Sequence, residues 1–332
     1  MSLASIKKID DLIPLENADS LCRANIEGWS IVVKKGEFMI GDLCVYIEID
    51  SILPDKPEFS FLKERGFRVK TIRLRGCLSQ GIAFPMTILP KGDYTLDQDV
   101  TELLGVQKFS RELQTSLTGL AKGNFPNFMM KTDEPLMQGT SKSGYKEFFG
   151  LPYYISTKID GTSSTFFFNT NGTFGACSRN FEVSDGNNIY WDIVKKYDIE
   201  KKLIDVWTQT GRYLGIQGEI AGPKIQGNKL KLTEHQLFIF DIYDIVTKQY
   251  LPLKSMLALC AILELPTVPI EETGDQFTYT MSELLERAKG NYASGRLKEG
   301  IVVRPINAVT SKRHGNRLSF KVMNNDFLEK DK

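Results

Sequence analysis

The chain has 332 residues, which is enough for two domains that each bury a core. Its hydrophobic content of 42% and charged content of 25% are typical of soluble globular proteins, and its net charge of +1 excludes a uniformly basic coat for nucleic acid. No apolar run is long enough to cross a bilayer, and the N-terminus lacks the apolar core of an export signal. An intracellular protein without membrane association is therefore expected.

Cysteine and histidine usage excludes two kinds of site. The five cysteines are widely spaced and form no Cys-x-x-Cys pair, so zinc ribbons and redox pairs are not expected. Reduced thiols fit an intracellular protein best. The chain has only two histidines, His235 and His314, so catalysis by a histidine base or a metal site built from histidines is not expected.

Residues 1–108 are predicted to form a small β-barrel domain. Strand patterns separated by glycine or proline occur at 29–33, 41–50, 68–74 and 82–84. In 41–50 the apolar residues alternate, which predicts a strand with one buried face. Small barrels of the oligonucleotide-binding (OB) type present strands and loops to nucleic acid.

A concentrated basic segment lies within this region. Against the single acid Glu64 stand six cations, namely Lys63, Arg65, Arg68, Lys70, Arg73 and Arg75. The alternation in 68–74 predicts a basic face on one side of a strand. Two interpretations stay open, a solvated strand and turn or a phosphate-binding patch. The nucleic-acid-binding candidates are Arg68, Lys70, Arg73 and Arg75.

Residues 109–150 lose the strand pattern and are predicted to connect the barrel to a second domain at 151–332. That domain mixes strands and helices. Strand patterns occur at 154–158, 165–168, 214–220, 236–244, 298–305 and 317–322. Helical spacing occurs at 188–211, 254–263 and 282–289.

Lys158 ends the first of these strands, directly before the turn-prone pair Asp160-Gly161. Taken alone, Lys-x-Asp-Gly fits a surface hairpin better than a catalytic site. A partly desolvated lysine there would favour its neutral, nucleophilic form. The glycine lets the chain approach a ligand closely.

Four more charged residues lie on otherwise apolar strands, namely Arg179, Glu219, Glu299 and Lys321. Charges on core strands are costly unless they are paired or bind a ligand. Together with Lys158 they suit a nucleoside triphosphate and a divalent metal, because cations offset phosphate charge and carboxylates hold the metal or its waters. Phe240 fits either a stacking partner for a base or a plain core residue.

In their order these residues resemble the motifs of the covalent nucleotidyltransferase superfamily, which contains ATP-dependent ligases and mRNA capping enzymes. The six motifs are Lys158-Ile159-Asp160-Gly161, Ser178-Arg179-Asn180, Gly218-Glu219, Phe238-Ile239-Phe240-Asp241, Glu299-Gly300-Ile301-Val302-Val303-Arg304 and Phe320-Lys321-Val322. The resemblance implies an α+β fold, with an N-terminal OB-like β-barrel followed by an ATP-grasp-like ligase nucleotidyltransferase domain of antiparallel sheets with flanking helices.

The resemblance also implies roles for the catalytic and metal-binding residues. Lys158 would attack the α-phosphate of ATP and carry AMP, and Lys321 would contact that phosphate. Glu219 would contact the ribose or a metal-bound water, and Glu299 would bind Mg²⁺ or Mn²⁺ through water.

The remaining implied roles concern the nucleotide. Phe240 would stack on adenine, and Arg179 would contact a phosphate of the nucleotide or of the nucleic acid. Asp160 and Gly161 complete the expected nucleotide-binding set.

Three features resemble the RNA ligase branch. Many DNA ligases and capping enzymes have arginine where this chain has Ser163. Only 11 residues follow Lys321, so the C-terminal OB domain of those enzymes is not expected. The OB-like region is N-terminal instead. One departure is Ser319, which stands where the superfamily often has the first lysine of Lys-x-Lys. Its candidate substitutes are Lys312, Arg313 and Arg317.

The expected function is therefore that of a monomeric, ATP-dependent RNA ligase that joins 3′-OH and 5′-phosphate ends through lysyl-AMP and an adenylylated 5′ end. Its expected partner is RNA or a nicked duplex with RNA on the 3′-OH side. Two alternatives stay open at this point. One is a DNA ligase or a GTP-using capping enzyme, and the other is a non-catalytic RNA-binding protein on a ligase fold.

Overall fold

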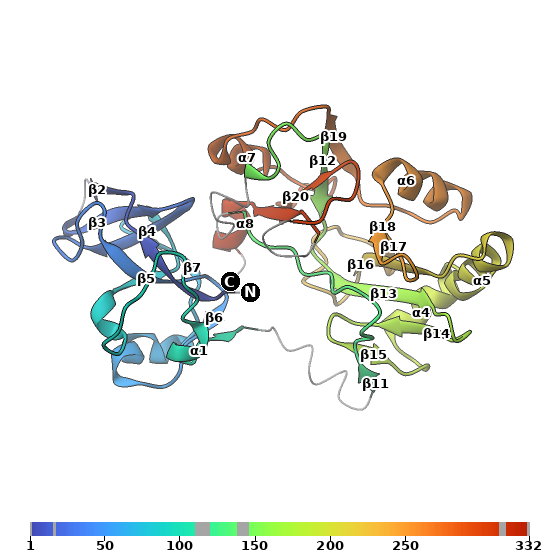
Figure 1. The fold of residues 1–332 in the computed structure, drawn as a ribbon, viewed down its shortest axis with the longest axis horizontal. Coiled ribbons are helices and arrows are strands. Elements are labelled where there is room, and N and C mark those ends of the chain that lie inside the picture. Colours follow the sequence, from blue (N-terminus) through green and yellow to red (C-terminus); the bar gives the residue numbers. More distant parts are fainter. Residues whose placement is uncertain (1, 16–17, 110–119, 138–145, 312–316, 331–332) are drawn as a thin grey trace. The chain divides into compact units, whose positions relative to one another are not determined.

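A computed structural model describes residues 2–15, 18–109, 120–137, 146–311 and 317–330 (Figure 1). The chain divides into two compact units, each with a hydrophobic core of its own. Unit 1 consists of Met1–Glu112, Met137–Tyr145 and Leu328–Lys332, and unit 2 of Leu113–Leu136 and Lys146–Phe327. Among the described residues, no helix combines the length and apolar character needed to span a membrane.

Unit 1 is built from short antiparallel strands and little helix. Its strands are β1 (Ala4–Lys8), β2 (Asp11–Leu15), β3 (Ala18–Ile26), β4 (Trp29–Lys34), β5 (Leu43–Ile47), β6 (Ser51–Ile52), β7 (Thr71–Leu74), β8 (Cys77–Gln80), β9 (Ile82–Pro85) and β10 (Gln107–Lys108). They pair in the orders β1-β5-β9, β2-β3-β4, β7-β8 and β10-β6. The helical pieces are η1 (Pro57–Arg65), η2 (Met86–Ile88) and α1 (Thr101–Leu104).

Two strand predictions in unit 1 are wrong in detail. In β5 the predicted alternation is absent, since Leu43 is exposed and all of the residues from Cys44 to Ile47 are buried. Both faces of this strand are covered, because Val45 and Ile47 pack in the apolar core of unit 1 while the Tyr46 ring packs against Trp29 of β4. β7 begins at Thr71, so Arg68 and Lys70 lie before it and share no strand face with Arg73.

Unit 2 contains two antiparallel sheets. A seven-stranded sheet has the order β11-β15-β14-β13-β16-β17-β18, and a four-stranded sheet has the order β19-β12-β20-β21. Their strands are β11 (Ala121–Asn124), β12 (Tyr153–Lys158), β13 (Thr162–Phe168), β14 (Phe174–Cys177), β15 (Phe181–Val183), β16 (Leu214–Ala221), β17 (Gln236–Asp244), β18 (Gln249–Tyr250), β19 (Ile270–Gly274), β20 (Gly300–Pro305) and β21 (Phe320–Met323). β12 and β13 are consecutive in the chain, so the turn of residues 159–161 joins the two sheets.

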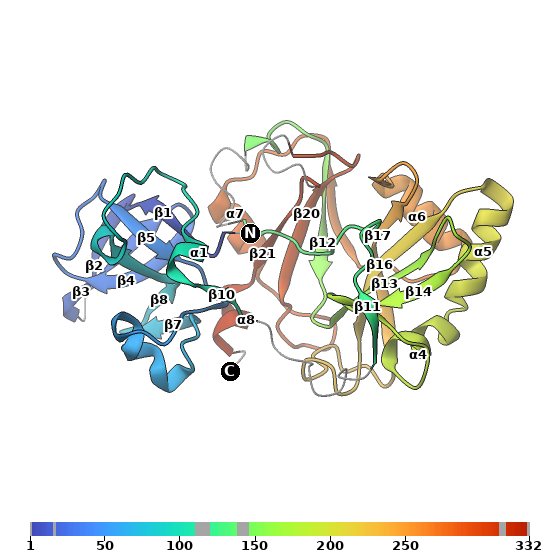
Figure 2. The ribbon, with the colours of Figure 1, turned by 60° about the horizontal axis from the view of Figure 1, so that its bottom comes forward.

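Helices cover one face of the seven-stranded sheet (Figure 2). They are α4 (Ile189–Lys196), α5 (Ile199–Thr210) and α6 (Leu253–Ile262), and their apolar side chains pack on those of β13, β16 and β17. The helix predicted over 188–211 is two helices, because Asp198 between them adopts a left-handed conformation with φ of 51°. The last helices are α7 (Met281–Arg287) and α8 (Asn325–Lys330).

Candidate active site

Lys158 is the last residue of β12 and lies opposite Gly300 on β20. Its ammonium nitrogen Nζ is 2.7 Å from the carboxylate oxygen Oε2 of Glu299. The two side chains are only 21% and 15% exposed. The antiparallel pairing thus brings together two predicted site residues that are 141 positions apart in the sequence.

Two glycines allow the strands of the site to approach closely. A Cβ atom on Gly161 would come within 2.4 Å of the Ile220 carbonyl oxygen and 2.8 Å of the Glu219 side chain. Gly300 has φ of 152°, and a Cβ atom there would lie 2.1 Å from the Val322 carbonyl oxygen. Glycine at position 161 lets Glu219 pack beside the turn that follows β12, and glycine at position 300 lets β21 pack closely against β20.

The hydroxyl of Tyr292 ties three site residues together. It donates a hydrogen bond to the Lys158 carbonyl at 2.7 Å. It also accepts from the backbone N–H groups of Asp160, at 3.0 Å, and Glu299, at 3.1 Å. A single buried hydroxyl therefore fixes the backbone of the lysine relative to two carboxylates.

The charge state of Lys158 differs from the sequence-based expectation. Burial lowers the pKa of Lys158, but Glu299, Glu219 and Asp160 together raise it above its ordinary value. The expected neutral amine is therefore wrong, since the three carboxylates outweigh desolvation. Lys158 is an ammonium ion paired with Glu299.

The pKa values of the neighbouring carboxylates are raised as well, which for an acid favours the neutral form. Burial, together with Glu299 and Asp160, raises the pKa of Glu219 to about 8 against the lowering effect of Lys158. Burial and Glu299 raise the pKa of Asp160 to about 6, although Lys229 lies 3.1 Å away. The negative charges of these carboxylates repel one another, and a further cation would relieve that repulsion.

The other predicted residues lie around this centre. Lys321 pairs with Val302, which pairs with Ser156, so the alternation of strand side chains puts Lys321 and Lys158 on the same sheet face. Phe240 is half-buried in the cluster of apolar side chains that contains Ile159.

Arg179 is also predicted for the site, but its guanidinium has a protein partner. It lies in the turn after β14 and forms an ion pair with Asp133.

Comparisons with known proteins agree with this architecture. The RNA ligase family model matches residues 151–323, and an OB-fold domain model matches residues 3–86. The chain belongs to the RNA ligase family. No curated protein sequence matches it.

Solved structures of Naegleria gruberi RNA ligase are similar to this ligase over its whole length. A lysine-to-alanine variant with ATP and Mn is 32% identical, has a TM-score of 0.89, and the match covers 99% of this chain and 100% of that one. A glutamate-to-alanine variant with AMP and Mn is 32% identical, with a TM-score of 0.89 and 100% of both chains covered. A structure with PPi is 32% identical, with a TM-score of 0.87 and coverage of 99% and 98%.

The family and the fold predicted from the sequence are thus confirmed. The ligase has mixed α+β architecture, with an N-terminal OB-fold domain and a nucleotidyltransferase domain of antiparallel sheets and helices. As an RNA ligase it is an enzyme that forms phosphodiester bonds.

In unit 1 of the ligase, the four predicted nucleic-acid-binding residues differ in their surroundings. Arg68 forms an ion pair of 2.7 Å with Asp50 and lies 3.4 Å from the centre of the Phe109 ring. Arg73 forms an ion pair of 2.7 Å with Glu329. Lys70 and Arg75 are exposed.

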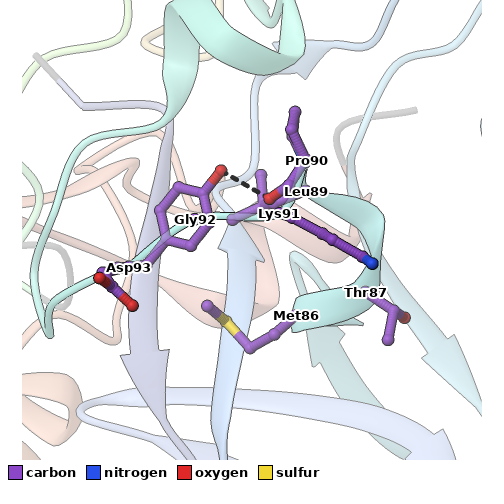
Figure 3. A pocket seen from close by; sticks show the side chains of 8 residues that line it. Met86, Thr87, Leu89, Pro90, Lys91, Gly92 and Asp93 are labelled. Atoms are coloured by element: carbon purple, nitrogen blue, oxygen red, sulfur yellow. Dashed lines mark hydrogen bonds between the residues drawn. The ribbon is translucent and has the colours of Figure 1, made fainter.

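A pocket of about 550 Å³ lies elsewhere on unit 1 (Figure 3). It is lined by Met86, Thr87, Leu89, Pro90, Lys91, Gly92, Asp93 and Tyr94. The Tyr94 hydroxyl donates to the Pro90 carbonyl at 2.9 Å, so the loop closes on itself. No predicted site residue lines this pocket.

The structure describes one of the three candidate substitutes for the lysine that Ser319 replaces. Arg317 forms an ion pair with Asp241 and lies 4.4 Å from the centre of the Tyr250 ring, so its charge already has a partner. The other two candidate substitutes, Lys312 and Arg313, lie outside the described residues.

Sequence reasoning missed three residues of the ligase site. Tyr292 contacts Lys158, and Lys229 contacts Asp160, across more than 60 positions of sequence, and no local pattern marks them. Glu134 lies in the predicted connector, where no sequence pattern points to a role. The fold brings it to Arg304, 170 positions away, at 2.5 Å.

Proposed function

We propose that this ligase is ATP-dependent and works through a covalent lysyl-AMP intermediate on Lys158. The observation that carries the proposal is the 2.7 Å pair between Lys158 and Glu299, at the junction of two sheets and beside a second buried glutamate, Glu219. The Naegleria gruberi RNA ligase structures with ATP or AMP and Mn support ATP as the nucleotide.

In the first step, Lys158 Nζ attacks the α-phosphorus of ATP. A phosphorus–nitrogen bond forms, the bond from the α-phosphorus to the bridging oxygen breaks, and pyrophosphate leaves. Lys158 must lose a proton before it attacks, and the nearest described acceptor is Glu299 at 2.7 Å. Lys321, on the same sheet face, contacts the α-phosphate and offsets its charge.

A divalent metal fits the residues present. Glu219 has a pKa raised to about 8, which marks a buried carboxylate short of positive partners, whereas Oδ2 of Asp160 already pairs with Lys229 at 3.1 Å. Glu219 and Glu299 would hold Mg²⁺ or Mn²⁺ through carboxylate oxygens. Since the described residues contain no ready cluster of three acidic, cysteine or histidine ligands, we propose contact through water. When bound, the metal would offset the charge of the ATP phosphates.

The nucleotide is held by residues around this centre. The half-buried ring of Phe240 stacks on adenine. Arg179 contacts a phosphate after exchanging its partner Asp133. Asp160 and Gly161 line the turn between the two sheets, where the nucleotide meets Lys158.

The second and third steps transfer AMP to RNA and seal the strand. AMP passes from Lys158 to a 5′-phosphate, and a 3′-OH then attacks the adenylylated end, forms the phosphodiester and releases AMP. The substrate proposed is a nicked duplex with RNA on the 3′-OH side, held by the basic segment of unit 1 through Lys70 and Arg75, with Arg68 and Arg73 beside them. The enzyme is proposed to act as an intracellular monomer, and its five unpaired cysteines suit a reducing compartment.

Nick sealing on four duplexes tests this function, with RNA or DNA placed separately on each side of the nick. We expect ATP to support sealing, GTP not to support it, and RNA on the 3′-OH side to be required. Equal sealing of all-DNA nicks would contradict the substrate, and GTP dependence would contradict the nucleotide.

A further inference from the structure

The segment of residues 130–136, named the connector segment here, crosses both sheets of unit 2. At its start, the Met130 carbonyl accepts a hydrogen bond of 2.6 Å from Nε2 of Gln217 on β16. The Thr132 and Ser163 hydroxyls are 2.6 Å apart, which connects the segment to β13. This stretch therefore touches β16, which carries the Gly218-Glu219 motif, and β13, which directly follows the Lys158–Gly161 motif.

The end of the connector segment covers the edge of the four-stranded sheet. β21 is the outermost strand of that sheet. The backbone N–H of Lys321 donates to the Pro135 carbonyl at 2.9 Å, and Leu136 forms a parallel bridge with Lys321. The position of the Lys321 backbone thus depends on how this segment is seated.

Glu134 anchors the segment through both of its carboxylate oxygens. Oε1 lies 2.5 Å from Nη2 of Arg304 on β20, and Oε2 accepts from the hydroxyl of Ser319, which directly precedes β21. The side chains of Arg304 and Glu134 are 2% and 14% exposed, so this ion pair is largely enclosed. A carboxylate held by two neighbouring strands fixes their register relative to the segment.

The cluster around Glu134 is balanced in charge. Two guanidinium groups, of Arg304 and Arg317, lie with two carboxylates, of Glu134 and Asp241. Arg304 is 3.7 Å from Asp241, which is a weaker contact than its 2.5 Å pair with Glu134. Burial raises the pKa of Glu134, but Arg304, Ser319 and Arg317 hold it below its ordinary value, so the carboxylate stays charged at neutral pH.

We propose that Glu134 is a positioning residue for nucleotidyl transfer, which aligns Lys321 with the α-phosphate by seating the connector segment against β21. The inference rests on the proposed function, because it assumes that Lys321 contacts that phosphate. It also assigns a task to Ser319, whose hydroxyl holds Glu134 at the position where the superfamily often has a lysine.

A double-mutant cycle on lysyl-AMP formation tests the proposal. Glu134→Gln keeps the shape of the side chain and removes its charge. We expect the rate at saturating ATP to fall about tenfold with the KM for ATP changed less than about twofold, because positioning acts on the transition state. If Lys321→Ala lowers the rate of lysyl-AMP formation about 100-fold, the double variant should lower it about 100-fold as well. Independent effects of the two substitutions would lower it about 1000-fold.

The matched control is Glu272→Gln. Glu272 pairs with Arg287 and accepts from Tyr153, whose side chain lies on the opposite face of β12 from Lys158. Its substitution should leave lysyl-AMP formation within about twofold. If Glu134→Gln does not yield folded protein, Ser319→Ala removes one hydroxyl of the same cluster and enters the same cycle.

Two results would overturn the proposal. One is that the rate losses of Glu134→Gln and Lys321→Ala multiply in the double variant, and the other is that Glu272→Gln slows lysyl-AMP formation as much as Glu134→Gln does. Lys158→Ala distinguishes these from a failure of the proposed function. If Lys158→Ala still formed the AMP adduct, the proposed function would fail, whereas a multiplicative cycle with an adduct that requires Lys158 would remove only the role of Glu134.

Discussion

The two units of this ligase carry their charge in opposite ways. In unit 1, six cations fall within residues 63–75, yet Arg68 and Arg73 are paired with Asp50 and Glu329. In unit 2, Lys158 and Glu299 are 141 positions apart in sequence and meet at 2.7 Å in a half-buried centre. Two cations that are close together in the sequence of unit 1 thus pair with separate partners. Two charged residues that are far apart in the sequence of unit 2 meet at one site.

The physical reason is the surroundings of each charge. An exposed cation is hydrated and gains little from any one partner, so a run of them makes a surface. A charge on a core strand must be paired or bind a ligand, because an isolated buried charge is costly. Convergence of buried charges is therefore the better sign of a site than local density.

The largest expected effect comes from the converging cluster. Glu299→Gln should lower lysyl-AMP formation by about 100-fold or more, because it removes the partner of Lys158 and a proposed metal-binding carboxylate at once. Transfer of labelled AMP from ATP to the protein measures it. A loss of less than about threefold would show that the pair is structural only.

The buried ion pairs of the same unit should matter for stability. Glu134→Gln should destabilise the protein by about 3 kcal/mol at pH 7, because Arg304 and Arg317 are left with Asp241 alone. Since the folded-state pKa of Glu134 is below its ordinary value of 4.5, its contribution is present above that pH and is lost as the pH falls through the folded-state pKa. Urea unfolding of both proteins at pH 7 and at about pH 3.5 measures this, and a difference that did not shrink in acid would contradict it.

Tyr292→Phe should have an intermediate effect. The ring stays packed, but the hydroxyl that joins Lys158, Asp160 and Glu299 is lost, so we expect lysyl-AMP formation about tenfold slower. Tyr153→Phe is the matched control, because its hydroxyl bonds Glu272 on the other sheet face. Equal rates for Tyr292→Phe and the wild type would argue against a positioning role.

The smallest effect should come from unit 1. Lys70→Glu with Arg75→Glu should weaken binding to a nicked duplex about fivefold at moderate salt and reduce its salt dependence, because exposed cations contact phosphates. Arg68→Gln should weaken it less, since Arg68 already pairs with Asp50. Equilibrium binding over a series of salt concentrations measures both. An unchanged salt dependence in the double variant would exclude this segment as the RNA contact.

The sequence predicts features that depend on neighbouring residues, but it does not predict contacts between residues far apart in the chain. The strand that ends at Lys158 and the order of the motifs were readable, because alternation and motif spacing are local properties of the chain. The roles of Tyr292 and Glu134 were not, since their hydrogen bonds reach residues 134 and 185 positions away. The charge of Lys158 was also missed, because it depends on three carboxylates that only the fold brings near.

The site of AMP attachment tests the central claim most directly. The protein is incubated with labelled ATP and Mg²⁺ or Mn²⁺, digested, and the labelled peptide is sequenced by mass spectrometry. We predict one AMP group on Nζ of Lys158 and no label in Lys158→Ala. An adduct on another residue, or full labelling of Lys158→Ala, would contradict the account.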